Sequence, residues 1–259
     1  MEHSYSTMDA SYTESVWWAF KELFKKGLVY QGFKPMHICP RCETTLSNNE
    51  VTSNYKDITD ISVTAKFELV KEQDTYILAW TTTPWTLPGN VALAVSPDAE
   101  YVKVAIGDEK YILASARAET ALAGKEYTVV SRMKGSELVG AEYKPIFDYY
   151  SEQGTLPNRE NGWKVYGADF VTMESGTGVV HIATAFGEDD MNLGMKENLP
   201  FVQHVSMDGT MKKEVRDFAG VSVKPKSDEK DGHQATDILI IKHLAGIGAL
   251  FSKEKIVHA

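Results

Sequence analysis

The stretch AWTTTPWTLPGN, residues 79–90, sets three threonines beside two prolines, two tryptophans and an asparagine. Consecutive threonines suit a β-strand, because a branched Cβ packs well on a pleated surface. Proline cannot donate to a strand ladder, so Pro84 and Pro88 end that strand almost at once. The stretch therefore predicts a strand running into a hydroxyl-rich loop, and sheet packing alone does not explain such a loop.

Alternating apolar residues predict further strands around this stretch. Residues 60–69 alternate with period two, and YILAW (76–80) runs directly into the threonines. A turn at residues 107–109 predicts a hairpin between YVKVAI and KYILASA. Other strands are predicted in YTVVSRM (127–133), WKVYGADFV (163–171) and GVVHIA (178–183), with short helices near residues 115–122 and 189–198.

Many strands without strict βαβ alternation favour an α+β fold that is mainly β, a barrel or strongly curved sheet with peripheral helices. A helix is expected over residues 11–26, with Ser11 and Glu14 as a capping box and Gly27 as its end. We expect three parts: a lead-in helix and connecting segment (1–54), the barrel core (55–225) and a helical return segment (226–259). No repeat or low-complexity tract is visible, and we expect a piece excised from a longer protein.

Composition excludes several classes of protein. A chain of 259 residues with 43% hydrophobic and 24% charged residues is typical of a globular protein. A net charge of −9 argues against a broad cationic face for nucleic acid. Two cysteines cannot form a disulfide framework, and neither a signal peptide nor an apolar run long enough to span a membrane is visible. These features indicate a cytoplasmic protein without a membrane segment.

Two residues near a pair of glycines have a catalytic or binding interpretation and a structural one. Gly176 and Gly178 predict a close backbone turn before a strand, and a helix follows. Asp190 in its first turn would be held ionised by the helix dipole and could bind an ammonium group, or it could simply cap the helix. His181 alternates with apolar residues and so faces either a polar cavity or a hydrogen-bonded scaffold.

The threonines, Asn90 and the cysteines leave the same choice open. Threonine hydroxyls can donate and accept around a carbonyl or water, although a threonine-rich strand needs no ligand. Asn90 is either a turn residue or an amide presented to a ligand. Cys39 and Cys42 have the spacing of a zinc knuckle but supply only half of a four-ligand site, so a zinc-ribbon interaction module is a minor alternative. Sequence motifs of serine hydrolases, zinc proteases and phosphate-binding loops are not found.

Taken together, WTTTPWTLPGN and GTGVVHIATAFGEDD (176–190) resemble the two signature segments of the editing insertion of isoleucyl-tRNA synthetases. Leucyl and valyl relatives have arginine and proline after a threonine pair, whereas this chain has Thr83 and then PWTLPGN. The similarity extends from MDASYTESVWW near the start to LFSKEKIVHA at the end and so covers nearly the whole chain. The ATP-binding signatures of the synthetases are not found, so we expect editing without amino acid activation.

The resemblance implies a role for each candidate residue. Asp190 would bind the α-ammonium of the substrate, and Thr82 and Thr83 would position the ester carbonyl, the ribose or the attacking water. His181 would border the aliphatic side chain and set its maximum size. The other residues implied to bind substrate or form the wall are Trp80, Thr81 and Asn90, with Trp85 as scaffold.

The resemblance also implies the reaction and the partners. The expected reaction is hydrolysis of valyl-tRNA(Ile) to valine and free tRNA, without a cofactor; ATP, and any zinc at Cys39 and Cys42, would serve only the full-length parent. Expected partners are the 3′ end of mischarged tRNA(Ile), its valine moiety and the catalytic domain of the parent synthetase. The isolated domain is expected to be a cytoplasmic monomer. The alternative is a module that binds the tRNA end but is inactive without its parent.

Overall fold

The structure is a computed structural model that describes residues 6–39, 41–53, 55–224 and 232–258, and it divides into two compact units, Met1–Lys34 and Pro35–Ala259. The first unit contains helix α1 (Ala10–Lys25), none of whose residues is buried. The predicted helix is confirmed, but its predicted capping box is wrong. Asp9 is the N-cap, so Ser11 and Glu14 already lie inside the helix.

The second unit contains the sheets. Its strands are β1 (Ile38–Cys39), β2 (Thr44–Thr45), β3 (Ile58–Glu68), β4 (Thr75–Thr81), β5 (Ala92–Val95), β6 (Glu100–Ile106), β7 (Glu109–Ala114), β8 (Thr128–Lys134), β9 (Lys164–Gly167), β10 (Val179–Ile182) and β11 (Leu250–His258). They form sheets of two strands (β1-β2), three strands (β10-β5-β9) and six strands (β11-β3-β4-β7-β6-β8). Most of the strands predicted from alternation are present at the expected positions.

The six-stranded sheet is mixed and open. Neighbouring strands pair antiparallel, including the predicted β6-β7 hairpin, except that β4 and β7 run parallel. Within the part of the chain that the structure describes, the end strands β8 and β11 do not pair with each other. The α+β class is therefore confirmed, whereas closure into a barrel stays a prediction.

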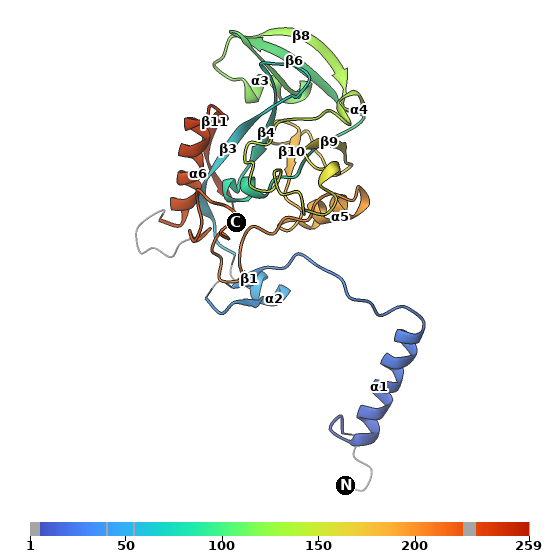
Figure 1. Ribbon diagram of the computed structural model, residues 1–259. Helices are drawn as coiled ribbons and strands as arrows, with labels where there is room; N and C mark the ends of the chain where they lie inside the picture. Colours follow the sequence, from blue (N-terminus) through green and yellow to red (C-terminus); the bar gives the residue numbers. More distant parts are fainter. Residues whose placement is uncertain (1–5, 40, 54, 225–231, 259) are drawn as a thin grey trace. The chain divides into compact units, whose positions relative to one another are not determined.

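The main core lies between the six-stranded and three-stranded sheets. Alternate residues of β3, Val63, Ala65 and Phe67, are fully buried in this core together with all four residues of β5. Figure 1 shows β10 beside β4, and the two strands are in contact. This contact brings the end of the threonine strand next to the strand that carries His181.

Short helices occupy the connections. They are α2 (Asn48–Thr52), η1 (Pro84–Gly89), η2 (Ser115–Arg117), α3 (Ala118–Ala121), α4 (Gly135–Leu138), η3 (Arg159–Asn161), α5 (Glu188–Lys196), η4 (Gly232–Gln234) and α6 (Ala235–Gly246), of which those labelled η are 3₁₀ helices. Proline fixes φ and lacks an N–H, which suits the first position of a helix, and Pro84 occupies that position in η1. The prolines of the quoted stretch thus turn the chain from β4 into a tight helical loop.

The return segment differs from its helical prediction. Helix α6 is present as expected, but the chain then forms β11, which pairs antiparallel with β3 along its length. Strand β11 carries Lys253, Glu254 and Lys255 in succession, so its sequence has a weak strand pattern and its pairing depends on the neighbouring strand. Figure 1 shows α6 and β11 beside β3, so the end of the chain lies against the central sheet.

Candidate active site

A cavity of about 280 Å³ lies at the end of β4, where the two signature segments meet. Its lining includes Trp80, the three consecutive threonines 81–83, His181 and Asp190, residues that are far apart in the sequence. Thr86, Phe170, Thr172, residues 175–180, Ala183 and Phe186 complete the lining. Six of the seven residues predicted to bind or act on substrate are therefore brought together.

One side of this cavity is a chain of hydroxyl groups that we call the threonine wall, comprising residues 81–83 and Thr86. The Oγ1 atoms of Thr81 and Thr83 are 3.3 Å apart, and Thr81 Oγ1 also accepts from the Thr83 backbone N–H at 3.1 Å. The Thr86 hydroxyl donates to the carbonyl oxygen of Thr83 at 2.8 Å. Because these groups bond to one another, the hydroxyls of Thr81, Thr83 and Thr86 are held in fixed positions.

His181 continues this chain from the facing strand. Its Nε2 lies 2.9 Å from Thr86 Oγ1, and since that hydroxyl already donates its proton to Thr83, Nε2 must carry the hydrogen. The Nδ1 atom is then an acceptor, and it is buried without a hydrogen-bond partner among the described residues. Burial, together with the nearby His204, lowers the pKa of His181 to about 4. The imidazole is therefore neutral at physiological pH, with one acceptor unused.

Asp190 occupies the third position of helix α5 and lines the same cavity as the threonine wall. The expectation that the helix dipole holds it ionised needs correction, because burial raises the pKa of its carboxyl to about 7, against the lowering effect of a hydrogen bond with the Ala183 backbone. The side chain reaches back over the helix start, where a Cβ on Gly187 would lie 2.1 Å from Asp190 Oδ2. Together His181 and Asp190 form what we call the histidine–aspartate wall.

Two glycines shape the floor between the walls. Gly176 and Gly178 have φ of +62° and +71°, a conformation that favours glycine. A Cβ on Gly176 would lie 2.9 Å from the Trp80 ring, and one on Gly178 would lie 2.4 Å from the Cβ of Ala114. The predicted glycine turn is thus required both for its backbone conformation and for its close packing.

Asn90 is placed away from these walls. Its Nδ2 donates to the carbonyl oxygen of Ala92 at 2.9 Å, and its Oδ1 accepts from the hydroxyl of the fully buried Tyr143 at 2.7 Å. The residue is not part of the cavity lining. The structure therefore gives Asn90 a role in fixing the chain after η1, and its predicted contact with substrate is not supported by this placement.

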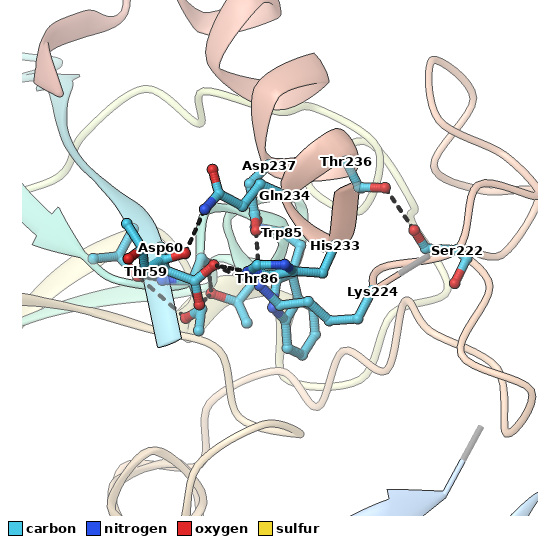
Figure 2. Close-up of polar contacts among 12 residues, drawn as sticks. Thr59, Asp60, Trp85, Thr86, Ser222, Lys224, His233, Gln234, Thr236 and Asp237 are labelled. Atoms are coloured by element: carbon cyan, nitrogen blue, oxygen red, sulfur yellow. Dashed lines mark hydrogen bonds and ion pairs between the residues drawn. The ribbon is translucent and has the colours of Figure 1, made fainter. Parts of the chain in front are cut away.

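A buried charge cluster supports the threonine wall from outside (Figure 2). Asp237, from helix α6, accepts from the Trp85 backbone N–H at 3.1 Å, and His204 Nε2 bonds the Trp85 carbonyl oxygen at 3.0 Å. Lys224 Nζ lies 2.9 Å from Asp237 Oδ2 and 3.5 Å from Asp60 Oδ1. The peptide between Thr83 and Thr86 is therefore held on both sides, by the return segment and by a buried histidine.

Sequence reasoning missed Thr86, Asp237 and Lys224. Thr86 could have been found, because it lies three residues after Thr83 and a helical turn brings such residues to one face. Asp237 and Lys224 have no local signal, since each acts through a contact with a residue more than ten positions away. Trp85, predicted to be scaffold, packs edge-to-face on Phe186 with ring centroids 5.3 Å apart.

The cysteine pair lies in the small β1-β2 hairpin. The Cys42 N–H donates to the carbonyl oxygen of Cys39 at 3.2 Å, a tight turn between the two residues. Over the described ranges, no group of three or more His, Cys, Asp or Glu residues is arranged to hold a metal ion. The zinc half-site at Cys39 and Cys42 stays a prediction. No described helix has the length and apolar character that crossing a membrane requires.

Comparison with known families gives a match over most of the chain. The model of tRNA synthetases class I (I, L, M and V) matches residues 1–236. The "Probable isoleucine--tRNA ligase, cytoplasmic" of Dictyostelium discoideum is 41% identical over 270 residues, covering 100% of this chain and 24% of that protein. The isoleucine–tRNA ligase of Bdellovibrio bacteriovorus is 44% identical over 264 residues, again with 100% and 24% covered. The chain thus spans about a quarter of the length of these relatives.

Comparison with solved structures gives matches to two editing-domain structures of leucyl-tRNA synthetases. The structure named GlLeuRS-CP1 superposes with a TM-score of 0.52 at 16% identity, covering 74% of this chain and 99% of its own. The editing domain of the cytosolic leucyl-tRNA synthetase of P. knowlesi superposes with a TM-score of 0.39 at 13% identity, covering 55% and 66%. The first of these similarities indicates a shared fold over about three quarters of this chain.

Proposed function

The chain belongs to the family of class I tRNA synthetases, and from that membership we propose that it is the editing domain of an isoleucyl-tRNA synthetase and hydrolyses valyl-tRNA(Ile). The proposal rests on one observation above all: a small cavity is lined both by the threonine wall and by the partly buried carboxyl group of Asp190. Its volume of about 280 Å³ is at the low end for a ligand pocket, which suits an aminoacyl group and its sugar.

The carboxylate of Asp190 is suited to hold the α-ammonium of the valyl group. An ammonium and a carboxylate form a charge-assisted hydrogen bond, and such bonds are strong where water is excluded. The raised pKa of about 7 means that the empty site is partly protonated at neutral pH. A bound ammonium favours the ionised form, so binding and loss of the Asp190 proton are linked, and binding strengthens as pH rises through 7.

The threonine wall and His181 are suited to position the reacting atoms. In the proposed step, a water oxygen attacks the ester carbonyl carbon, the bond to the ribose oxygen breaks, and a proton goes to that departing oxygen. The hydroxyls of Thr82 and Thr83 would orient the ester, and the unused Nδ1 of His181 would accept a hydrogen bond from the water. An activated ester needs no covalent enzyme intermediate, so no nucleophilic side chain is required.

Selectivity for valine over isoleucine would come from size. One methylene in an apolar pocket separates two substrates by only about 1–3 kcal/mol, a general figure usually illustrated with isoleucine and valine and not obtained from this chain. The synthetic site of the full-length enzyme rejects amino acids that are too large. An editing cavity that admits only the smaller amino acid therefore adds a size test of the opposite sense. His181 and Phe186 both line the cavity and are suited to limit the length of the side chain.

The parent protein supplies the remaining parts of the proposal. The 3′ end of mischarged tRNA(Ile), the rest of the synthetase with its ATP site, any zinc at the cysteine pair and a cytoplasmic location all belong to the parent. Closure of the sheets into a barrel and a monomeric state of the isolated domain also remain part of the proposal. The alternative, a module that only binds the tRNA end, has the same expected partners but predicts no hydrolysis.

Deacylation assays test the function. The purified chain at micromolar concentration is expected to release valine from valyl-tRNA(Ile) and to leave isoleucyl-tRNA(Ile) intact. The Thr83→Val variant, which keeps the shape of the side chain but lacks its hydroxyl, is the matched control for contaminating activity. Binding without release of valine would favour the alternative module, and equal hydrolysis of both esters would contradict the size test.

A further inference from the structure

A second cavity of about 210 Å³ adjoins the first and shares part of its wall. Trp80, Gly176 and Thr177 belong to the linings of both cavities. The rest of the second lining consists of Thr64, Arg117, Thr120, Ala121, Ser252, Lys253 and Glu254. The two cavities are therefore neighbours that share one indole ring and one glycine turn.

Strand pairing explains how the second cavity forms. Ser252 of β11 pairs with Thr64 of β3, and Thr64 pairs with Trp80 of β4, so the three side chains lie in a row on one face of the sheet. Helix α3 covers this row with Thr120 and Ala121. The hydroxyl groups of Ser252, Thr64 and Thr120 give this cavity a polar lining.

Arg117 gives the second cavity its distinctive charge. The side chain is tethered at one point, because its Nε donates to the Gly176 carbonyl oxygen at 3.1 Å, and the two terminal nitrogens of the guanidinium remain as donors for a ligand. Lys253 adds a second positive charge, and Glu254 adds a negative one. Trp80 Nε1 donates to Glu254 Oε1 at 3.2 Å, so this carboxylate already has a hydrogen bond to the indole that both cavities share.

A phosphate is the ligand that this combination fits. Guanidinium groups bind phosphate oxygens through paired N–H donors, hydroxyl groups commonly add phosphate contacts, and nucleosides pack on aromatic rings. The net charge of −9 repels a polyanion, so a local cation beside the site matters more here than on a basic protein. The first cavity, at about 280 Å³, accommodates the acyl group and sugar, which leaves the phosphate of the same nucleotide outside it.

We propose that the second cavity is a phosphate subsite, in which Arg117 binds the 5′-phosphate of the nucleotide whose ester is hydrolysed next door. This inference rests on the proposed function, because it assumes that an aminoacyl nucleotide occupies the first cavity. In this arrangement Trp80 lies between the two subsites, and its ring contacts the nucleotide in each of them.

Two small esters that differ by one phosphate test the proposal. The substrates are 2′(3′)-O-valyladenosine and the same ester carrying a 5′-phosphate, and kcat/KM is measured for the chain and for Arg117→Gln. The unmodified chain is expected to prefer the phosphorylated ester by about tenfold, the low end of the range for one hydrogen bond to a charged group. Arg117→Gln should lose that preference and should hydrolyse valyladenosine at the parental rate.

Further variants separate charge from loop structure. Arg117→Lys keeps the charge without the planar tether, so it should retain most of the phosphate preference. Thr120→Trp, at an exposed position of the lining, should block the cavity and abolish the preference without affecting valyladenosine. Arg216→Ala, which removes an arginine paired with Asp148 and outside both linings, is the control and should change neither rate.

The outcomes distinguish the two proposals. With valyl-tRNA(Ile), the slope of log kcat/KM against log salt should fall by about 0.7 in Arg117→Gln, the value for one phosphate contact on a single strand. Suppose that the unmodified chain hydrolyses both small esters. If Arg117→Gln then keeps the preference for the phosphorylated ester, or loses both activities together, the phosphate subsite is overturned and the proposed function stands. If the unmodified chain hydrolyses neither the small esters nor valyl-tRNA(Ile), the proposed function itself fails.

Discussion

The two walls of the first cavity satisfy their polar groups in opposite ways. On the threonine wall the hydroxyls of Thr81, Thr83 and Thr86 bond to one another and to the backbone. On the histidine–aspartate wall, the Nδ1 atom of His181 has no partner among the described residues, and burial raises the pKa of Asp190 to about 7. The difference indicates that the first wall fixes geometry, whereas the second retains binding capacity for a ligand.

The largest effect is expected for Asp190→Asn, which removes the charge from the wall that retains binding capacity. Losing a hydrogen bond between two charged groups costs about 1.5–3 kcal/mol, so kcat/KM for valyl-tRNA(Ile) should fall by about a hundredfold. In the parent chain kcat/KM should rise between pH 6 and 8, as the carboxyl with its raised pKa ionises, and the variant should lack this rise. Parental activity in Asp190→Asn would contradict the ammonium role.

Thermal unfolding gives an independent check on the same residue. A carboxyl whose folded pKa lies above its unfolded value contributes stability that is fully present below pH 4 and is lost as pH rises through 7. Asparagine carries no such dependence. The difference in Tm, Asp190→Asn minus the unmodified chain, should therefore be larger at pH 8 than at pH 4. A difference that does not change with pH would show that Asp190 is not desolvated.

The second-largest effect is expected for Thr86→Val, which removes the hydrogen bond between the threonine wall and His181. Valine cannot accept from His181 Nε2 or donate to Thr83, so the imidazole loses the bond that fixes its tautomer. We expect kcat to fall about tenfold, the cost of about one well-placed hydrogen bond, with KM little changed. The ¹⁵N shifts of His181 should show a protonated Nε2 in the parent and a mixture in the variant.

A smaller effect is expected for Gly187→Ala, which displaces Asp190 without removing it. The new Cβ would lie 2.1 Å from Asp190 Oδ2, so the carboxylate must rotate, and the backbone φ of −147° tolerates alanine. We expect about a fivefold increase in KM, less than the loss of a full charged hydrogen bond. Gly246→Ala, where a Cβ meets no atom within 4 Å, is the matched control.

Support of the threonine wall from outside should matter less for rate than for stability. Asp237→Asn keeps an oxygen for the Trp85 N–H, whereas Asp237→Ala leaves that N–H without this acceptor and leaves Lys224 with its longer 3.5 Å contact to Asp60 (Figure 2). Breaking a fully buried ion pair costs about 3–5 kcal/mol, and the loss here should be smaller because the Lys224 side chain is 34% exposed. The alanine variant should therefore lower the Tm and reduce kcat about threefold. If Asp237→Asn and Asp237→Ala have the same kcat, the Trp85 contact does not position the wall.

The smallest effect on rate is expected for Asn90→Ala. Asn90 bonds Tyr143 and Ala92 and does not line the cavity, so the variant should lose about 1–2 kcal/mol of stability through the unpaired Tyr143 hydroxyl. Its kcat/KM, measured below the unfolding transition, should equal that of the parent. A large loss of kcat with an unchanged Tm would restore the predicted contact with substrate.

The same contrast explains what the sequence could and could not predict. Strands with clear alternation, such as residues 60–69, and helices with helical spacing were predictable because their signals are local. The cavity residues Thr83, His181 and Asp190 were predictable because two distinctive segments identify them. The partner of Asn90, the Asp237 contact and strand β11 depend on residues distant in sequence, and no local pattern encodes such contacts.

Titration of Asp190 in the presence of a stable substrate analogue tests the central claim most directly. The analogue is 3′-deoxy-3′-valylamino-adenosine, whose amide resists hydrolysis and whose ammonium is intact, and the carboxyl is followed by ¹³C NMR. If the ammonium binds between the two walls, saturation with the analogue should lower the pKa of Asp190 from about 7, because a nearby cation favours the carboxylate. An analogue that binds and leaves the titration of Asp190 unchanged would contradict the account.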